Sequence, residues 1–190
     1  MPRHFSGFLL CTACLLLLTA RSASSQPIPM TFDELVSEAN VVVRGYVADQ
    51  QAEWIDSDQG RAIVTVVTFR VERTLKGTNR VQIPLEFLGG TIGDVGLRPS
   101  HVPTFEVGDR AVLFLDTTER LISPVVGSEL GLFRIVVSPD GSGDAVVSHN
   151  GVTFSSVVQL GVPSADGAPA APMSLGRFEA EIVQAVQEIR

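Results

Sequence analysis

The stretch from Ile63 to Glu72 alternates between two sets of side chains, and this pattern constrains the fold more than any other feature of the chain. One set is apolar apart from a single threonine, and the other becomes polar towards its end. Successive side chains of a strand point to opposite faces of a sheet, so the pattern predicts a long, half-buried strand. The first set is Ile63, Thr65, Val67, Phe69 and Val71, and the second is Val64, Val66, Thr68, Arg70 and Glu72.

Further apolar runs predict short strands on both sides of this one. Pro84 cannot donate a hydrogen bond to a neighbouring strand, so it marks a sheet edge or a bulge. Asn150-Gly151 predicts a two-residue hairpin turn. Many short strands at near-regular spacing are typical of an antiparallel sandwich or a closed barrel. The other predicted strands cover residues 41–48, 51–56, 81–87, 111–115, 121–126, 132–137, 145–148 and 152–158.

One helix is predicted on each side of this β-rich body. Thr31 and Glu34 have the spacing of a capping box, which begins a short helix ending at about Ala39. Ser174 can cap a C-terminal amphipathic helix over residues 174–190, which we expect to dock on this protein's own body. Its apolar face would carry Leu175, Phe178, Ile182, Val186 and Ile189, and its polar side Glu179, Glu181 and Glu188.

Residues 1–25 have the pattern of a secretory signal peptide that is removed. Arg3 and His4 precede an apolar stretch that is too short for an ordinary membrane span, and small polar residues follow it. We expect cleavage after Ser25, with the positions after Ser22 and Ala23 as alternatives. No later apolar stretch is long enough to span a bilayer. The sequence therefore predicts an exported protein, periplasmic or extracellular, without a stable membrane span.

The rest of the chain divides into a body and a tail. Residues 26–160 are expected to form the β-domain, residues 161–173 a linker rich in Pro, Gly and Ala, and residues 174–190 the final helix. Cys11 and Cys14 both lie within the predicted signal peptide, so the mature chain would have no disulfide, catalytic thiol or Cys-ligated metal. The net charge of −7 argues against nucleic acid as a partner.

The order of several short motifs resembles that of a group of uncharacterised bacterial exported proteins. The same layout is similar to the netrin-like modules and the tissue inhibitors of metalloproteinases, over about Leu35 to Val137. The resemblance implies an OB-like closed antiparallel β-barrel with a packed helix. The motifs are residues 41–47, 67–73, 75–77, 89–96 and 107–109, followed by the apolar run 112–115.

The inhibitory mechanism of the tissue inhibitors does not transfer with the fold. Those inhibitors place a Cys at the mature N-terminus, where its amine and carbonyl approach the protease zinc. Here that position would be Gln26, followed by Pro27. An inhibitor of some other geometry remains an alternative.

The segment from Gly89 to Gly108 is the predicted site, because it is a long connection with little strand or helix pattern. Long loops in compact domains often bind ligands, and glycine allows a ligand to approach the backbone closely. A loop that merely crosses the barrel is the alternative. The candidate partner-binding residues are Gly89, Gly90, Gly93, Asp94, Gly96, Arg98 and His101.

No catalytic, metal or cofactor motif is found in the sequence. The glycines of 89–96 lack the context of a phosphate loop, and His149 is interpreted as a solvated turn residue. The acidic runs at 56–60 and 140–144 fail the EF-hand spacing and predict hairpin turns. Trp54 shares a strand face with Ala52 and is expected in the core.

These observations favour a non-catalytic secreted or envelope binding module whose partner is an extracellular or envelope protein, with no cofactor. An inhibitor or accessory module of an extracellular protease is the first alternative. The second is a hydrolase in which Asp94 and Glu106 form an acid–base pair.

Overall fold

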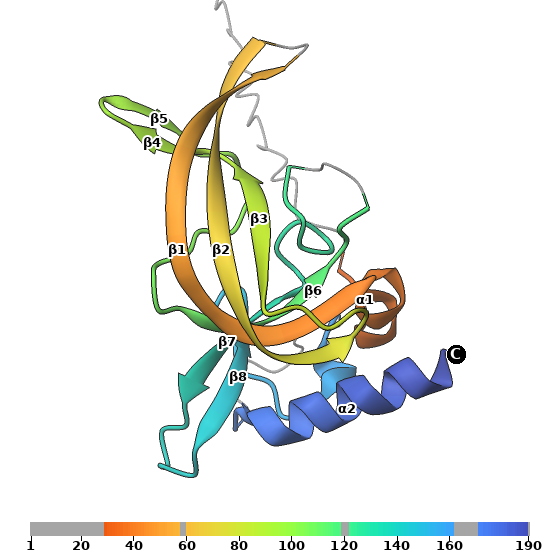
Figure 1. Ribbon diagram of the computed structural model, residues 1–190. Helices are drawn as coiled ribbons and strands as arrows, with labels where there is room; N and C mark the ends of the chain where they lie inside the picture. Colours follow the sequence, from red (N-terminus) through yellow and green to blue (C-terminus); the bar gives the residue numbers. More distant parts are fainter. Residues whose placement is uncertain (1–28, 58–59, 119–121, 162–170, 190) are drawn as a thin grey trace, which may run out of the picture.

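The protein is mainly β, and its described residues form one large antiparallel sheet and two α-helices (Figure 1). The computed structural model describes residues 29–57, 60–118, 122–161 and 171–189. The predicted signal peptide and most of the predicted linker lie outside these ranges. The order of strands in the large sheet is β3-β2-β1-β6-β7-β8-β9. The strands are β1 (Val41–Ser57), β2 (Gly60–Lys76), β3 (Gln82–Leu88), β6 (Arg110–Leu115), β7 (Leu132–Val137), β8 (Asp144–Ser148) and β9 (Met173–Ser174).

Strands β1 and β2 form a long curved ribbon (Figure 1). The register of β1 on β2 shifts at three places, one of them at Ala48, and such bulges bend a strand. Gly45 allows the backbones of β1 and β2 to approach each other closely, since a Cβ at this position would lie 1.9 Å from the carbonyl oxygen of Arg70. The prediction of two separate strands, at 41–48 and 51–56, was wrong. The bulge at Ala48 lets a single strand continue through the polar residues between these two ranges.

The predicted long strand is confirmed within β2. Ile63, Val67 and Phe69 are almost completely buried on one face of the ribbon, as the alternation requires. Val64 on the other face is also buried, so the second face is less open than the pattern suggested. Pro84 lies in β3, which is an edge strand with β2 as its neighbour, and this confirms the prediction of a sheet edge.

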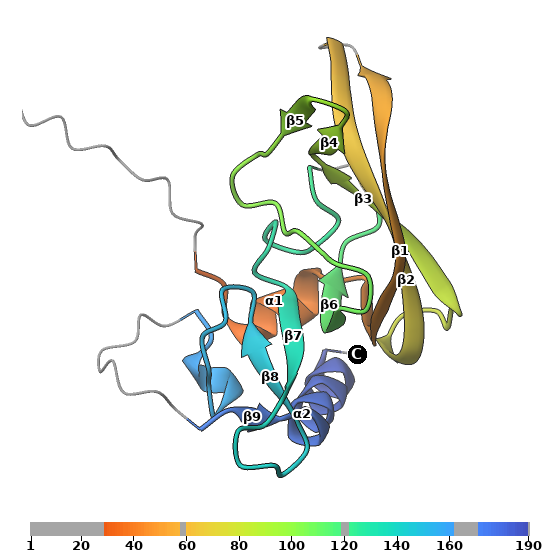
Figure 2. The same ribbon diagram turned by 90° about the vertical axis from the view of Figure 1, so that its left-hand side faces the viewer.

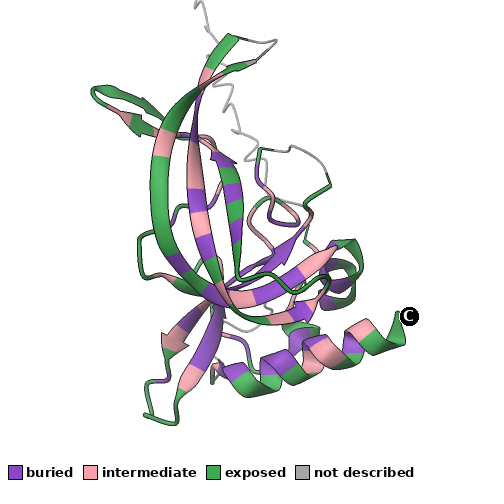
Figure 3. Cartoon of the chain, in the orientation of Figure 1, coloured by how far each residue is buried: buried purple, intermediate pink, exposed green. Residues whose placement is uncertain are grey.

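Two hydrophobic cores lie on opposite faces of β6, whose residues 111–115 are all buried. Val112 and Phe114 belong to the first core, which lies beneath the helices. Leu113 and Leu115 belong to the second core, which the curved strands β1, β2 and β3 enclose. The burial is concentrated around this strand and decreases along the β1–β2 ribbon (Figure 3).

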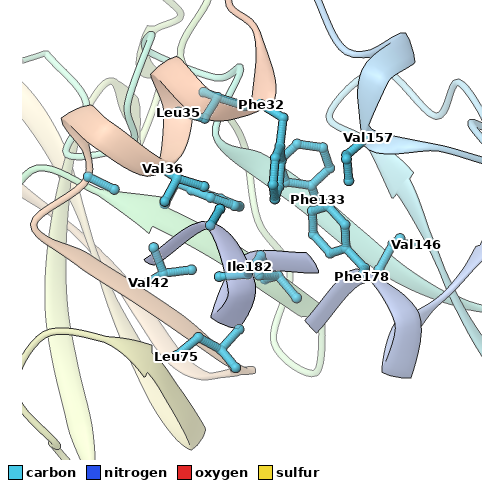
Figure 4. Packing of buried hydrophobic residues seen from close by; sticks show 14 of the residues in the cluster. Phe32, Leu35, Val36, Val42, Leu75, Phe133, Val146, Val157, Phe178 and Ile182 are labelled. Carbon is cyan, nitrogen blue, oxygen red and sulfur yellow. The ribbon is translucent and has the colours of Figure 1, made fainter. Parts of the chain in front are cut away.

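Both helices pack against the first core. The helix α1 (Phe32–Glu38) begins with the predicted capping box, in which Thr31 and Glu34 bond each other reciprocally. The helix α2 (Leu175–Glu188) buries Leu175, Phe178 and Ile182. Phe178 lies against the sheet residue Phe133, with 4.8 Å between ring centroids (Figure 4). The expected docking of the C-terminal helix is therefore confirmed, and neither described helix is long and apolar enough to span a bilayer.

Glu179 departs from the expected pattern, because it is buried instead of lying on the polar side of α2. Its carboxylate accepts hydrogen bonds from two guanidinium groups, from Arg44 on β1 at 2.9 Å and from Arg73 on β2 at 2.5 Å. Arg44 also approaches Glu72 at 3.2 Å. A buried carboxylate requires such partners, and the helical pattern alone does not show them.

Closure of the sheet into a barrel is not confirmed. Among the described strands, β3 pairs with β2 alone and β9 with β8 alone, so no pairing joins the two ends of the sheet. Two predicted strands are also wrong. Residues 122–126 form a loop with one bridge, Leu115 to Val125, and residues 152–158 form one bridge at Thr153 before the 3₁₀ helix η1 (Val157–Gln159). Pro124, with no N–H to donate, interrupts the first of these segments.

We predict that Glu179→Gln lowers the free energy of unfolding by about 2 kcal/mol. The change removes the charge that two arginines face, and the loss falls below that of a fully buried pair because Arg73 is half exposed. Urea denaturation measures it. Glu181→Gln on the same helix is the matched control, since its 3.8 Å pair with Arg177 is exposed and its loss is expected to cost less than about 0.5 kcal/mol. Equal losses in both variants would contradict the role of Glu179.

Candidate functional site

The segment 89–108 begins with a small β-hairpin, which the sequence analysis did not predict. Strand β4 (Gly90–Ile92) pairs with β5 (Val95–Leu97). The turn residue Gly93 has φ +59°, and Asp94 does not have a positive φ, as in the type II′ turn that suits two-residue hairpins. The Gly93-Asp94 pair was the signal for this turn. The hairpin stands off one face of the β1–β2 ribbon (Figure 2).

Two glycines fix the base of this hairpin on the ribbon. The amide of Gly89 donates to the carbonyl oxygen of Ile63 at 2.8 Å, and the hydroxyl of Thr65 donates to the carbonyl oxygen of Gly89 at 2.8 Å. Gly90 has φ +136°, and a Cβ there would lie 2.5 Å from the Thr65 hydroxyl oxygen. Both the backbone conformation and the close approach therefore require glycine at position 90.

A cleft of about 620 Å³ lies between the ribbon, the hairpin and the segment that follows it. Its floor is formed by side chains of β1, β2 and β3, and it continues the inner face of the second core. The hairpin forms one wall, and the segment from Arg98 to Phe105 forms the other. The floor residues are Gln50, Ala52, Thr65, Val67 and Phe87.

The lining of the cleft combines apolar and polar side chains. Phe87 and Phe105 contact each other at its base, with ring centroids 5.0 Å apart. Gln50, Thr91 and Arg98 offer polar atoms. The exposed guanidinium of Arg98 forms no hydrogen bond or ion pair within the described part of the chain, so its donors are available to a carbonyl or carboxylate oxygen of a ligand.

The structure brings together only part of the predicted site. Gly89, Gly90, Gly96 and Arg98 line the cleft. Gly93 and Asp94 form the hairpin turn and lie outside the lining, as does His101. The floor was missed because its residues lie in strands far from the loop in sequence. One sequence signal for this floor was the presence of a polar residue on the inner face of each strand, Gln50 in β1 and Thr65 in β2.

His101 lies instead in a cluster with a carboxylate and the second histidine of the described chain. Its Nδ1 is 2.9 Å from Oε1 of Glu129, and Nε2 of His149 is 3.7 Å from the same oxygen. Burial lowers the pKa of His149, although the negative charge of Glu129 acts to raise it. His149 lies in a turn, as interpreted, but its side chain is only 19% exposed and so is not fully solvated.

The carboxylates of the described chain do not assemble a metal or acid–base site in the cleft. No group of three or more His, Cys, Asp or Glu in the described ranges could hold a metal ion. Asp94 and Glu106 are both absent from the cleft lining. The segment 140–144 joins β7 to β8 as a turn, as predicted, and hydrogen bonds from Ser142 and Ser138 lower the pKa of Asp140 to about 2.

Trp54 is an exposed residue and not part of the core as expected. It is 37% exposed, and the guanidinium carbon of Arg61 lies 4.5 Å from the centre of its ring. The physical reason is the length of the ribbon. Pairing of β2 with β3 begins at Val64, so the end of the ribbon that carries Trp54 extends beyond the neighbouring strand.

Comparisons of the chain with protein-family models, with curated proteins and with solved structures found no match.

We predict that Gly90→Ala lowers the free energy of unfolding by about 2 kcal/mol, because alanine is strained at φ +136° and its Cβ would displace Thr65. Gly96→Ala is the control, since its nearest neighbour would be 3.5 Å away and its φ is not positive. The control should change stability by less than about 0.5 kcal/mol in the same denaturation experiment. A neutral Gly90→Ala would show that the hairpin base is not constrained as described.

We predict that stability falls as the pH is lowered below 6.5, in part through His149. The pKa of His149 in the folded protein lies below its ordinary value of 6.5, so below pH 6.5 the unfolded chain binds the proton more readily than the folded protein. The contribution of His149 to stability is therefore complete only above pH 6.5. Glu129, His101 and Arg134 set the local charge. His149→Gln should reduce the slope of melting temperature against pH between 7 and 5. An unchanged slope would contradict this assignment.

Proposed function

We propose that this chain is an exported, non-catalytic binding module that holds part of an extracellular or envelope protein in the cleft between the β1–β2 ribbon and the β4–β5 hairpin. The observation that carries the proposal is the cleft itself, because it places Ala52, Val67 and Phe87 next to the guanidinium of Arg98, which has no partner within the described part of the chain. Binding sites usually combine apolar side chains with placed polar groups, and the lining of this cleft contains both. Export is proposed on the pattern of residues 1–25 alone.

The scaffold suits such a role because the cleft is built mainly from regular structure. Its floor belongs to the sheet, whose inner face is fixed by the second core. Its hairpin wall is anchored through Gly89 and Gly90. Sites held by strands are positioned more accurately than sites on free loops.

We also propose that the curved part of the sheet, from β3 to β6, is related to an OB-like barrel. The strong bend of β1 and β2 and the helix on the outer face support this relation. A closed barrel would contain one further pairing between strands. In this proposal, the cleft lies at the position of that missing pairing.

The alternative of a protease inhibitor or accessory module rests on a different part of the hairpin. Its turn projects past β1 in Figure 1, and Val95 beside the turn is 51% exposed. A projecting turn with an exposed apolar side chain beside it could enter the active site of another protein. The cleft and the turn can be tested separately, because Gly96 lines the cleft and Val95 does not.

The test is capture of partners from the organism's own secreted and envelope fraction on the full chain carrying an affinity tag. We predict that the wild type and Val95→Trp retain a partner and that Gly96→Trp loses it, because the new ring fills the cleft without backbone strain. Both variants must melt within a few degrees of the wild type. Loss of capture in Val95→Trp alone would favour the inhibitor, and equal capture by all three proteins would refute binding in the cleft.

A further inference from the structure

Along the side of the cleft, no strand in the described part of the chain pairs with the edge of β1 that faces away from β2. Strand β1 pairs with β6 only from Val41 to Tyr46. Beyond that, the amide of Val47 donates to the carbonyl oxygen of Asp109, and the amide of Gly108 to that of Val47. From residue 48 to 57, the backbone hydrogen bonds within the described chain go to β2 alone. An unpaired edge of this length is a ready template for another strand.

The direction of the free backbone groups follows from one hydrogen bond. The carbonyl oxygen of Ile63 accepts from Gly89, so the backbone groups of Ile63 point towards β3 and away from β1. Ile63 lies opposite Trp54, whose own N–H and C=O must therefore point to the free edge. Because the pattern repeats every second residue, the same holds for Ala52 and Gln50.

These residues also face the cleft. Gln50 and Ala52 line its floor, and Trp54 lies on the same strand face by the period of two. A strand added antiparallel to this edge would place a side chain over the cleft floor at each residue that bonds to β1. Such side chains should be apolar, since they would lie beside Ala52, Trp54 and the exposed Leu97 of the hairpin.

The other face of the same edge is acidic. Asp49, Gln51 and Glu53 alternate with the cleft residues, and the two carboxylates form no ion pair within the described ranges. Opposite charges on neighbouring strands attract, and like charges repel. These carboxylates therefore disfavour a second copy of this chain at the edge and favour a strand with basic side chains on this face.

We propose that an extended segment of the partner protein, with alternating apolar and basic residues, adds antiparallel to the edge of β1 between residues 48 and 57. This rests on the proposed function and names the chemistry of the ligand for the same cleft. The apolar residues enter the cleft and bond to the backbone of Gln50, Ala52 and Trp54. The basic residues lie beside Asp49 and Glu53.

The probe is a synthetic peptide of about ten residues, the length of the free edge, with alternating valine and lysine. We expect it to bind the full chain at least about tenfold more tightly than a valine–glutamate peptide, measured by fluorescence anisotropy. The double variant Asp49→Lys/Glu53→Lys should reverse this preference. Both substituted side chains are exposed, and a melting curve confirms that the variant is folded. An unchanged preference would overturn the acidic face as the determinant.

Methylation of the peptide amides tests the strand pairing itself. In the antiparallel arrangement the valine amides point to β1 and the lysine amides to solvent. A peptide N-methylated at valine should bind at least about tenfold more weakly, and one N-methylated at lysine should bind as before apart from a small conformational effect. Equal binding of the two, or loss through the lysine amides only, would overturn the proposed pairing.

The proposed function and the proposed added strand can be refuted independently of each other. If the Gly96→Trp variant loses a captured partner but the peptides do not show the expected pattern, the cleft binds its partner by another route and only the added strand is refuted. If the valine–lysine peptide binds with the expected pattern but no cleft-dependent partner is captured, the edge accepts strands and the proposed function is refuted.

Discussion

Burial of β6 on both faces is the constraint on which the rest of the structure depends. Phe114 on one face packs against Phe32, Phe133 and Phe178, and Leu113 on the other belongs to the core under the curved ribbon. A strand of this kind requires a layer on each side. The helices supply one layer and the bending of β1 and β2 supplies the other, so the curvature that produces the cleft is a consequence of burying β6.

Elements with a strong local pattern were predicted correctly, whereas strand boundaries, weak strands and the pairing of distant strands were not. The capping box at Thr31 and the alternation in β2 were confirmed, because each depends on residues close in sequence. The apolar face of α2 was confirmed at Leu175, Phe178 and Ile182, whereas Ile189 beyond its end is 50% exposed. Closure of the barrel depends on which distant strands pair, and no short pattern encodes that. The burial of Glu179 is similar, since its arginine partners lie more than a hundred residues away.

In the candidate site too, the features that depend on local sequence could be predicted and those that depend on distant strands could not. The loop after Gly89 could be located from its length and its glycines, and four of the seven predicted residues line the cleft. Its floor could not be predicted, because Gln50 and Thr65 become neighbours only through the register of β1 on β2. The exposure of Trp54 depends on where β3 ends, which is again a property of the assembled sheet.

The position of α2 at the end of the described chain has a consequence for the order of folding. The first core lacks Phe178 and Ile182 until these residues leave the ribosome, so a chain still being synthesised cannot complete it. Domains fold as units once their parts are present. For a protein that is exported, as proposed above, the first core would therefore stay incomplete until α2 has been synthesised.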